Sequence, residues 1–296
     1  MLMLKSGYVP FGPYQTYYRI AGAEYLAQKV PLVLLHGGPG STHNYFEVLD
    51  DLAQADQRAL VMYDQLGCGQ SSMPDKTPDV YNQQNWLAEL VNLRQALGLK
   101  EIHLLGQSFG GMLTLMYMLT KPKGVKSIIL ASTLSSAKLW ADELHRLIKF
   151  MPEAEQEAIL TAEKQHDFQN PAYVAANEHF MRLHSADMTR PSLPKAVTRP
   201  KKTGTVAYLT GWGPNEYNPE GNLSGYEVTS RLAEITTPAL ITSGTDDLCT
   251  PLVAKTMYDH LPKARWELFA GCRHMSFVQE HDAYVTLLKE WLNQND

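Results

Sequence analysis

The sequence is poor in cysteine, since Cys68, Cys249 and Cys272 are the only three among 296 residues. They form no CxxC pair, and three cysteines cannot make a complete disulfide framework. The chain is therefore not a disulfide-stabilised scaffold. We expect a reducing, cytoplasmic setting.

Long hydrophobic runs are also missing. No stretch approaches the ~18 consecutive apolar residues that indicate a membrane-spanning helix. The opening residues MLMLKSGYVPFG lack the apolar core of a signal peptide. We therefore expect no membrane partner.

The chain has no excess of basic residues, because its formal net charge is −5. A nucleic-acid partner would require a basic patch, so none is expected. The one tight basic cluster, Arg199-Pro200-Lys201-Lys202, is interpreted as a solvated face. Hydrophobic residues make up 44% of the chain and charged residues 19%, which is typical of a globular protein with a sizeable core. Nothing in the sequence indicates an oligomeric state.

Short apolar runs alternate with segments of helical period, which predicts an α/β fold with a mostly parallel sheet flanked by helices. This alternation of strands and helices stops after Ser132 and resumes near residue 238. We expect a core in two parts, 1–133 and 226–296, with a helical cap, 134–225, inserted after the sixth strand. The expected strands are 31–35, 58–65, 102–108, 125–132, 238–244 and 264–271, and the expected helices are 43–55, 82–97, 109 onward, 252–261 and 282–292.

One motif stands between an expected strand and an expected helix. Gly106-Gln107-Ser108-Phe109-Gly110 fits G-x-S-x-G, the pattern of a nucleophile elbow. The turn is so sharp that side chains two residues before or after the serine would clash. Ser108 is therefore the predicted nucleophile, held at the carboxyl edge of the sheet.

A serine hydroxyl needs a base, and the base needs an acid, in the chain order Ser, Asp, His. The stretch SGTDDLCTP follows an expected strand and supplies the acid. Asp247 has the spacing expected for this role, and Asp246 is the alternative. His274 lies after the last expected strand and before the last helix, so it is the predicted base.

The loop His36-Gly37-Gly38-Pro39-Gly40 follows a strand, and its glycine backbone can approach a substrate closely. The N–H groups of Gly38 and Phe109 are expected to form an oxyanion hole. A phosphate-binding loop is the alternative, but no GK[ST] follows. Asp64 is interpreted as a loop-fixing carboxylate. No metal-ligand motif such as HExxH occurs, so neither a metal nor another cofactor is implied.

Together these stretches resemble the proline iminopeptidase (prolyl aminopeptidase) family and its tricorn-interacting aminopeptidase relatives, within the α/β-hydrolase superfamily. The resemblance rests on HGGPGSTHNYF, YDQLGCGQS, GQSFGGML, NPAYVAANEHF, GPNEY and ITSGTDDLCTP. It implies a serine aminopeptidase that releases N-terminal residues, proline first, from short peptides.

The same resemblance implies that carboxylates bind the free amine of the substrate. Glu216 of the GPNE motif is one of these carboxylates. In the family another follows the catalytic aspartate, but this chain has Leu248 there. Asp246, or Glu178 from the cap, is the expected substitute. Gly37 is a further expected substrate-binding residue.

Two other functions stay open from the sequence. An amino-acid amidase, or an esterase on small esters, could use the same serine, aspartate and histidine. A non-catalytic receptor built on this fold would have no need of all three residues, so their presence argues against it.

Overall fold

The computed structural model describes residues 2–188, 190 and 192–296. Among them the strands form one eight-stranded sheet in the order β1-β2-β4-β3-β5-β6-β7-β8. The first two strands are antiparallel to their neighbours, and the rest are parallel. The strands are β1 (Leu4–Phe11), β2 (Tyr14–Ala21), β3 (Leu32–Leu35), β4 (Leu60–Tyr63), β5 (Ile102–Gln107), β6 (Val125–Ala131), β7 (Ala239–Gly244) and β8 (Ala264–Phe269).

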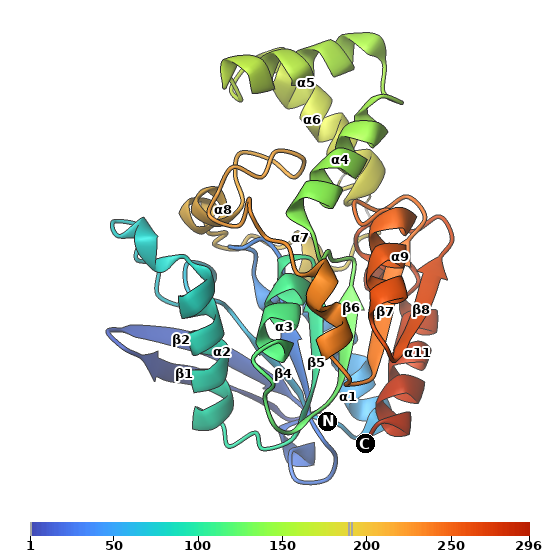
Figure 1. Cartoon of the computed structure of the whole chain (residues 1–296). Coiled ribbons are helices and arrows are strands. Elements are labelled where there is room, and N and C mark those ends of the chain that lie inside the picture. Colours follow the sequence, from blue (N-terminus) through green and yellow to red (C-terminus); the bar gives the residue numbers. More distant parts are fainter. Residues whose placement is uncertain (1, 189, 191) are drawn as a thin grey trace.

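Helices cover both faces of this sheet, as the alternation of strands and helices predicts (Figure 1). The α-helices are α1 (Asp50–Asp56), α2 (Gln83–Ala96), α3 (Phe109–Met118), α4 (Ala137–Ile148), α5 (Glu153–Gln165), α6 (Pro171–His184), α7 (Lys195–Thr198), α8 (Thr205–Gly211), α9 (Pro251–His260), α10 (Ser276–Gln279) and α11 (His281–Gln294). Short 3-10 helices are η1 (Ala23–Tyr25), η2 (His43–Leu49), η3 (Pro78–Val80) and η4 (Thr229–Glu234).

The core lies in two layers, one on each face of the sheet. Side chains alternate between the faces of a strand, so Val33 and Leu35 join a layer with α2, α3 and α9, whereas Leu32 and Leu34 join one with α1 and α11. The central strands β3 to β7 are buried on both faces, which is why they read as continuous apolar runs.

The chain from β6 to β7 leaves the sheet and forms α4 to α8. We call the expected insertion, residues 134–225, the cap; its limits stay a prediction. In Figure 1 the helices α4, α5 and α6 stand above the sheet. Among the described residues no helix is both long and apolar enough to cross a membrane.

Candidate active site

The turn that carries Ser108 joins β5 to α3 near the middle of the sheet. Ser108 has φ 55° and ψ −124°, a conformation that is costly for a residue with a side chain. A Cβ atom on Gly106 would lie 2.2 Å from the carbonyl oxygen of Gly110, and one on Gly110 would lie 1.9 Å from that of Leu35. No larger residue fits at either glycine of the motif for this steric reason. The turn presents Ser108 at the carboxyl edge of the sheet.

Asp247 and His274 meet in the loops that follow β7 and β8. Nδ1 of His274 lies 2.7 Å from Oδ1 of Asp247, and both side chains are buried. The N–H of Cys249 also donates to Oδ1, and the hydroxyl of Ser132 donates to Oδ2 at 2.6 Å. A carboxylate held in this way orients the imidazole and leaves Nε2 as the basic nitrogen.

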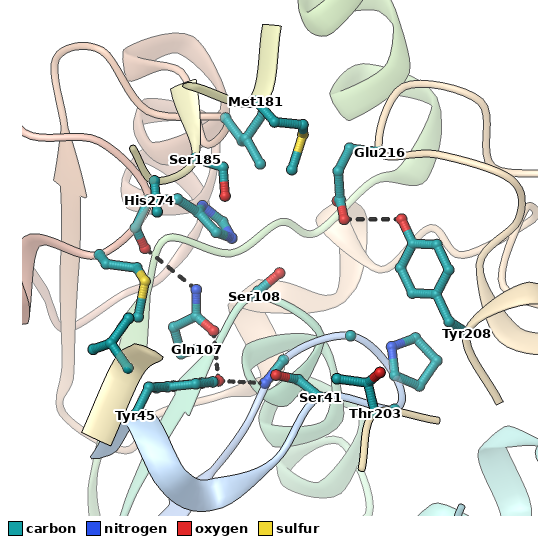
Figure 2. Close-up of a pocket in the computed structure, with 18 of the residues that line it drawn as sticks. Ser41, Tyr45, Gln107, Ser108, Met181, Ser185, Thr203, Tyr208, Glu216 and His274 are labelled. Carbon is teal, nitrogen blue, oxygen red and sulfur yellow. Dashed lines mark hydrogen bonds between the residues drawn. The ribbon is translucent and has the colours of Figure 1, made fainter. Parts of the chain in front are cut away.

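Ser108 and His274 both line one cavity of about 460 Å³ beneath the cap. Figure 2 shows their side chains near one another in this space, with Glu216 and Tyr208 across from His274. The core supplies the loops around Gly38 and Ser108, and the cap supplies residues from α6 to Glu216. Cavities of this size at the carboxyl ends of parallel strands are typical of ligand sites.

The residues expected to form the oxyanion hole flank the nucleophile. Gly38 lines the cavity with φ 111°, and a Cβ atom there would lie 2.6 Å from the nitrogen of Gly40. Phe109 is the first residue of α3, where amide groups have no partner within the helix. Gly37 lines the cavity too, but its N–H donates to the hydroxyl of Tyr45 at 2.7 Å, so that N–H is already engaged.

A buried polar network holds the three active-site loops together. The Tyr45 hydroxyl accepts the N–H of Gly37 and donates to Oε1 of Gln107 at 2.8 Å. The Gln107 amide nitrogen donates to the carbonyl oxygen of His274 at 3.3 Å (Figure 2). The glycine loop, the nucleophile turn and the histidine loop are thus fixed to one another through two side chains.

Glu216 brings a carboxylate to the same cavity. Its Oε1 accepts a hydrogen bond from the hydroxyl of Tyr208 at 2.8 Å (Figure 2). The indole N–H groups of Trp140 and Trp212 both donate to the carbonyl oxygen of Glu216, which fixes the backbone there. Burial raises the pKa of Glu216, and His274 and the Tyr208 hydroxyl oppose that rise. A cationic ligand would stabilise the ionised carboxylate.

The two acids expected to substitute at position 248 do not reach the cavity. Asp246 and Glu178 are both exposed and lie outside its lining. The backbone of Asp246, by contrast, makes two hydrogen bonds. Its N–H donates to the carbonyl oxygen of Cys272, and its own carbonyl oxygen accepts from Nδ1 of His184. Leu248 is buried and lines the cavity, so the wall at this position is apolar.

The interpretation of residues 199–202 as a solvated face is wrong for part of the cluster. Lys201 is half-buried and lines the cavity. The guanidinium of Arg199 pairs with the carboxylate of Glu47, and Lys202 is exposed as expected.

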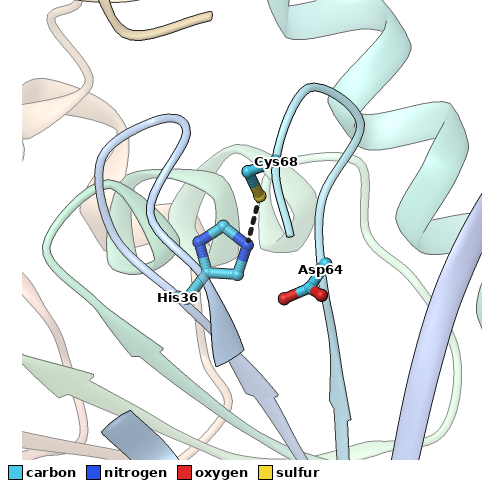
Figure 3. Close-up of side chains that lie close together, drawn as sticks. All are labelled: His36, Asp64 and Cys68. Atoms are coloured by element: carbon cyan, nitrogen blue, oxygen red, sulfur yellow. Dashed lines mark hydrogen bonds between the residues drawn. The ribbon is translucent and has the colours of Figure 1, made fainter. Parts of the chain in front are cut away.

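A second group of titratable side chains lies beneath the glycine loop. Ligand atoms of His36, Asp64 and Cys68 come within 4.8 Å of one another (Figure 3). Their hydrogen-bonding capacity is already used, however, because His36 Nε2 accepts the N–H of Gln65 and Asp64 Oδ1 accepts the N–H of His43. Burial lowers the pKa of His36 to about 4 and raises that of the Cys68 thiol. The arrangement is that of a hydrogen-bonded loop support, in keeping with the role expected for Asp64.

Reasoning from the sequence did not find Tyr45, Gln107, Lys201 or Tyr208 as site residues. Gln107 lies inside the recognised motif, but its side chain was not assigned a role there. The other three lie in a helical or basic stretch whose pattern says nothing about which side chain enters the cavity. Only their contacts across the fold reveal them.

Comparison with known proteins agrees with this geometry. The family model described as "alpha/beta hydrolase fold" matches residues 30–281. A proline iminopeptidase of Lactobacillus delbrueckii subsp. lactis is 61% identical over the full length of both chains, and one of Lactobacillus helveticus is 59% identical over 98% of each.

Solved structures agree as well. The proline iminopeptidase of Mycobacterium smegmatis aligns over 98% of both chains with a TM-score of 0.86 and 29% identity, and VinJ aligns over 99% of both with 0.91 and 31%. The resemblance inferred from the motifs is confirmed: the chain belongs to the proline iminopeptidase family of α/β-hydrolase enzymes.

Proposed function

We propose that this protein is a serine aminopeptidase that releases N-terminal proline from short peptides through an acyl-enzyme intermediate. The observation that carries the proposal is the carboxylate of Glu216 in the cavity that also holds Ser108 and His274. A nucleophile and base alone describe any serine hydrolase. A half-buried anion beside them selects a substrate with a positive charge near the scissile carbonyl.

In the proposed first half-reaction the Ser108 hydroxyl attacks the carbonyl carbon of the N-terminal residue, and its proton passes to Nε2 of His274. Asp247 stabilises the imidazolium that results. The N–H groups of Gly38 and Phe109 bind the oxyanion. His274 then gives its proton to the leaving nitrogen, the C–N bond breaks, and the shortened peptide departs.

In the second half-reaction His274 takes a proton from water, whose oxygen attacks the ester carbonyl of the acyl-enzyme. The tetrahedral intermediate collapses, Ser108 recovers the proton, and free proline leaves. The amine of the bound residue stays charged throughout. Its ammonium faces Glu216, whose ionised form it stabilises, so the substrate itself provides a counter-ion for this half-buried carboxylate.

The test is a substrate panel with proline, alanine and leucine naphthylamides and an acyl ester without an amine. We expect the proline compound to be released fastest and the ester to be a poor substrate. Ser108→Ala should lower turnover by on the order of 10³-fold or more, because only binding and the oxyanion hole remain. Faster turnover of the amine-free ester than of proline naphthylamide would contradict the proposal. So would a folded Ser108→Ala variant with wild-type activity.

We place this reaction in the cytoplasm. Supporting this setting, all three cysteines are buried and unpaired, as is usual where thiols are kept reduced. The expected substrate there is a small peptide with a free amino end.

A further inference from the structure

The cavity carries one charge of each sign besides its histidine. Among the described residues that line it, the carboxylate is that of Glu216 and the ammonium is that of Lys201. The other lining side chains are neutral and largely apolar or hydroxyl-bearing. A short peptide has the complementary pair, an ammonium at one end and a carboxylate at the other.

Lys201 lies at the edge of the cavity rather than beside Glu216. A second, polar hollow of about 720 Å³ adjoins it, and Lys201 is the one residue that the two linings share among the described residues. Glu216 lines only the catalytic cavity. Lys201 therefore lies where the catalytic cavity meets the outer hollow, and Glu216 does not.

The backbone near Lys201 is fixed to the core of the active site. The N–H of Gly204 donates to the carbonyl oxygen of Gly40 at 2.7 Å, and the N–H of Gly69 donates to that of Lys202 at 2.7 Å. A Cβ atom on Gly40 would lie 2.3 Å from the oxygen of Gly204. This close approach ties the Lys201 segment to the glycine loop, so Lys201 keeps a defined position relative to the nucleophile.

The Lys201 ammonium lacks an anionic partner among the described residues. Its Nζ donates to the carbonyl oxygen of Val197 at 3.1 Å, which leaves donors for another group. Its neighbour Arg199 is paired with Glu47, so the one carboxylate that the described residues show against this basic segment is already taken by another cation. Burial, with a smaller contribution from Arg199, lowers the pKa of Lys201. An anion bound there would oppose both effects.

We propose that Lys201 binds the C-terminal carboxylate of the substrate, so that the preferred substrates are free di- and tripeptides with N-terminal proline. This inference rests on the proposed aminopeptidase function. Each residue extends a peptide by about 3.5 Å. The carboxylate of a di- or tripeptide therefore stays near the scissile bond, whereas that of a longer peptide is carried away from it.

The experiment compares Pro-Ala with Pro-Ala amide, which share the amine and the scissile bond and differ in the terminal charge. The wild-type ratio of kcat/KM, free acid over amide, should exceed that of Lys201→Met by roughly tenfold, the scale of one charge-assisted hydrogen bond. Lys201→Arg should keep most of the ratio. Lys202→Met is the matched control, because Lys202 is the adjacent lysine and lines only the outer hollow; it should keep the wild-type ratio.

Equal ratios in the wild type and in Lys201→Met would overturn the inference, and so would an equal loss of ratio in Lys202→Met. Proline naphthylamide separates this failure from failure of the proposed function, since it has no carboxylate. If the wild type releases proline from the naphthylamide but does not distinguish acid from amide, Lys201 lacks the role and the aminopeptidase function stands. If it releases no proline from any of the three compounds, the function itself fails.

Discussion

At the scale of single residues, the acid in the loop after β7 is defined by its hydrogen bonds. Asp247 is buried and accepts from His274, Cys249 and Ser132, whereas the side chain of Asp246 is exposed. Two adjacent aspartates that the sequence scarcely separates are thus placed in opposite environments. Only one of them can stabilise an imidazolium.

We therefore expect Asp247→Asn to lower kcat by about 10⁴-fold, because the amide upsets the imidazole tautomer and leaves the imidazolium uncompensated. Asp246→Asn is the matched control and should retain nearly all activity. Steady-state kinetics on proline naphthylamide, with thermal melting to verify folding, provides the measurement. The opposite ranking of the two variants would show that the assignment is wrong.

Glu216 supports a second prediction. If its carboxylate binds the substrate ammonium, Glu216→Gln should lower kcat/KM for amine substrates by about 10- to 150-fold, equivalent to a charge-assisted hydrogen bond of roughly 1.5–3 kcal/mol. N-acetylating the substrate should cause a similar loss in the wild type.

The combination of the two changes is the control for that prediction. Acetylation should cost the Glu216→Gln variant little more, since both changes remove the same contact. Fully additive losses would mean that Glu216 shapes the cap without touching the amine. Leu248 makes this test more decisive, because Glu216 is the one carboxylate among the described residues that line the cavity.

At the scale of elements, most of the sheet could be predicted because its strands are buried on both faces. The runs at β3, β4, β5, β6 and β7 read directly as apolar segments. The hairpin of β1 and β2 was not predicted. β1 is the edge strand and is largely exposed, and β2 beside it mixes buried with partly buried residues, so neither has the continuous apolar run that marks the central strands.

The limits and types of the helices could be predicted only in part, because contacts with distant residues also determine them. The helix expected at 82–97 is α2, with Asn82 capping its first turn and Gly98 at φ 66° just after its end. The helix expected at 43–55 is divided into η2 and α1. The hydrophobic period is compatible with either form. What distinguishes them includes the His43 N–H, which donates to Asp64, a contact that the local sequence does not reveal.

The residues of the candidate site also fall into those that the sequence predicts and those that it does not. Ser108, Asp247 and His274 could be proposed because a sharp turn and a fixed chain order leave local signatures. Lys201 and Tyr45 could not, since their roles arise from loops that are far apart in the sequence. Asp246 and Glu178 were expected from the resemblance, and the fold turns both toward solvent.

The hydrogen-bond network through Tyr45 fixes the active-site loops to one another and does not itself bind substrate. Tyr45→Phe removes the partner of the buried Gly37 N–H, which should cost about 1–3 kcal/mol of unfolding free energy. We also expect kcat to fall roughly tenfold or more with a smaller change in KM, since the glycine loop and the nucleophile turn lose their register.

Tyr258→Phe, at an exposed tyrosine of α9, is the control for this prediction and should leave both quantities unchanged. Denaturant melts and steady-state kinetics check the two parts separately. A loss of stability with kcat unaffected would show that the network only supports the fold.

At the scale of the whole molecule, one buried acid makes stability depend on pH. Glu89 of α2 accepts the Thr16 hydroxyl of β2 and the Leu66 N–H after β4, so it joins three parts of the core. Burial raises its pKa from 4.5 to about 7. The folded protein therefore binds a proton that the unfolded chain has already released between these two pH values.

The contribution of Glu89 to stability is greatest below pH ~4.5 and is lost as the pH rises to about 7, by on the order of 3 kcal/mol. Glu89→Gln cannot ionise, so its melting temperature relative to wild type should rise between pH 5 and pH 8. Melting curves across this range provide the measurement, with Glu290→Gln, at an exposed glutamate of α11, as the control. Parallel curves for Glu89→Gln and wild type would contradict the prediction.

The position of the cap between β6 and β7 has a consequence for how the enzyme is made. A ribosome adds residues from the amino end, so Ser108 and the glycine loop are synthesised first, then the cap, and Asp247 and His274 only afterwards. The growing chain has a hydroxyl but no base, and it cannot hydrolyse cellular peptides while it is still being translated. In the proposed mechanism, activity begins only when β8 has joined the sheet and brought the His274 loop to Ser108, so hydrolysis reports that the two parts of the core have come together.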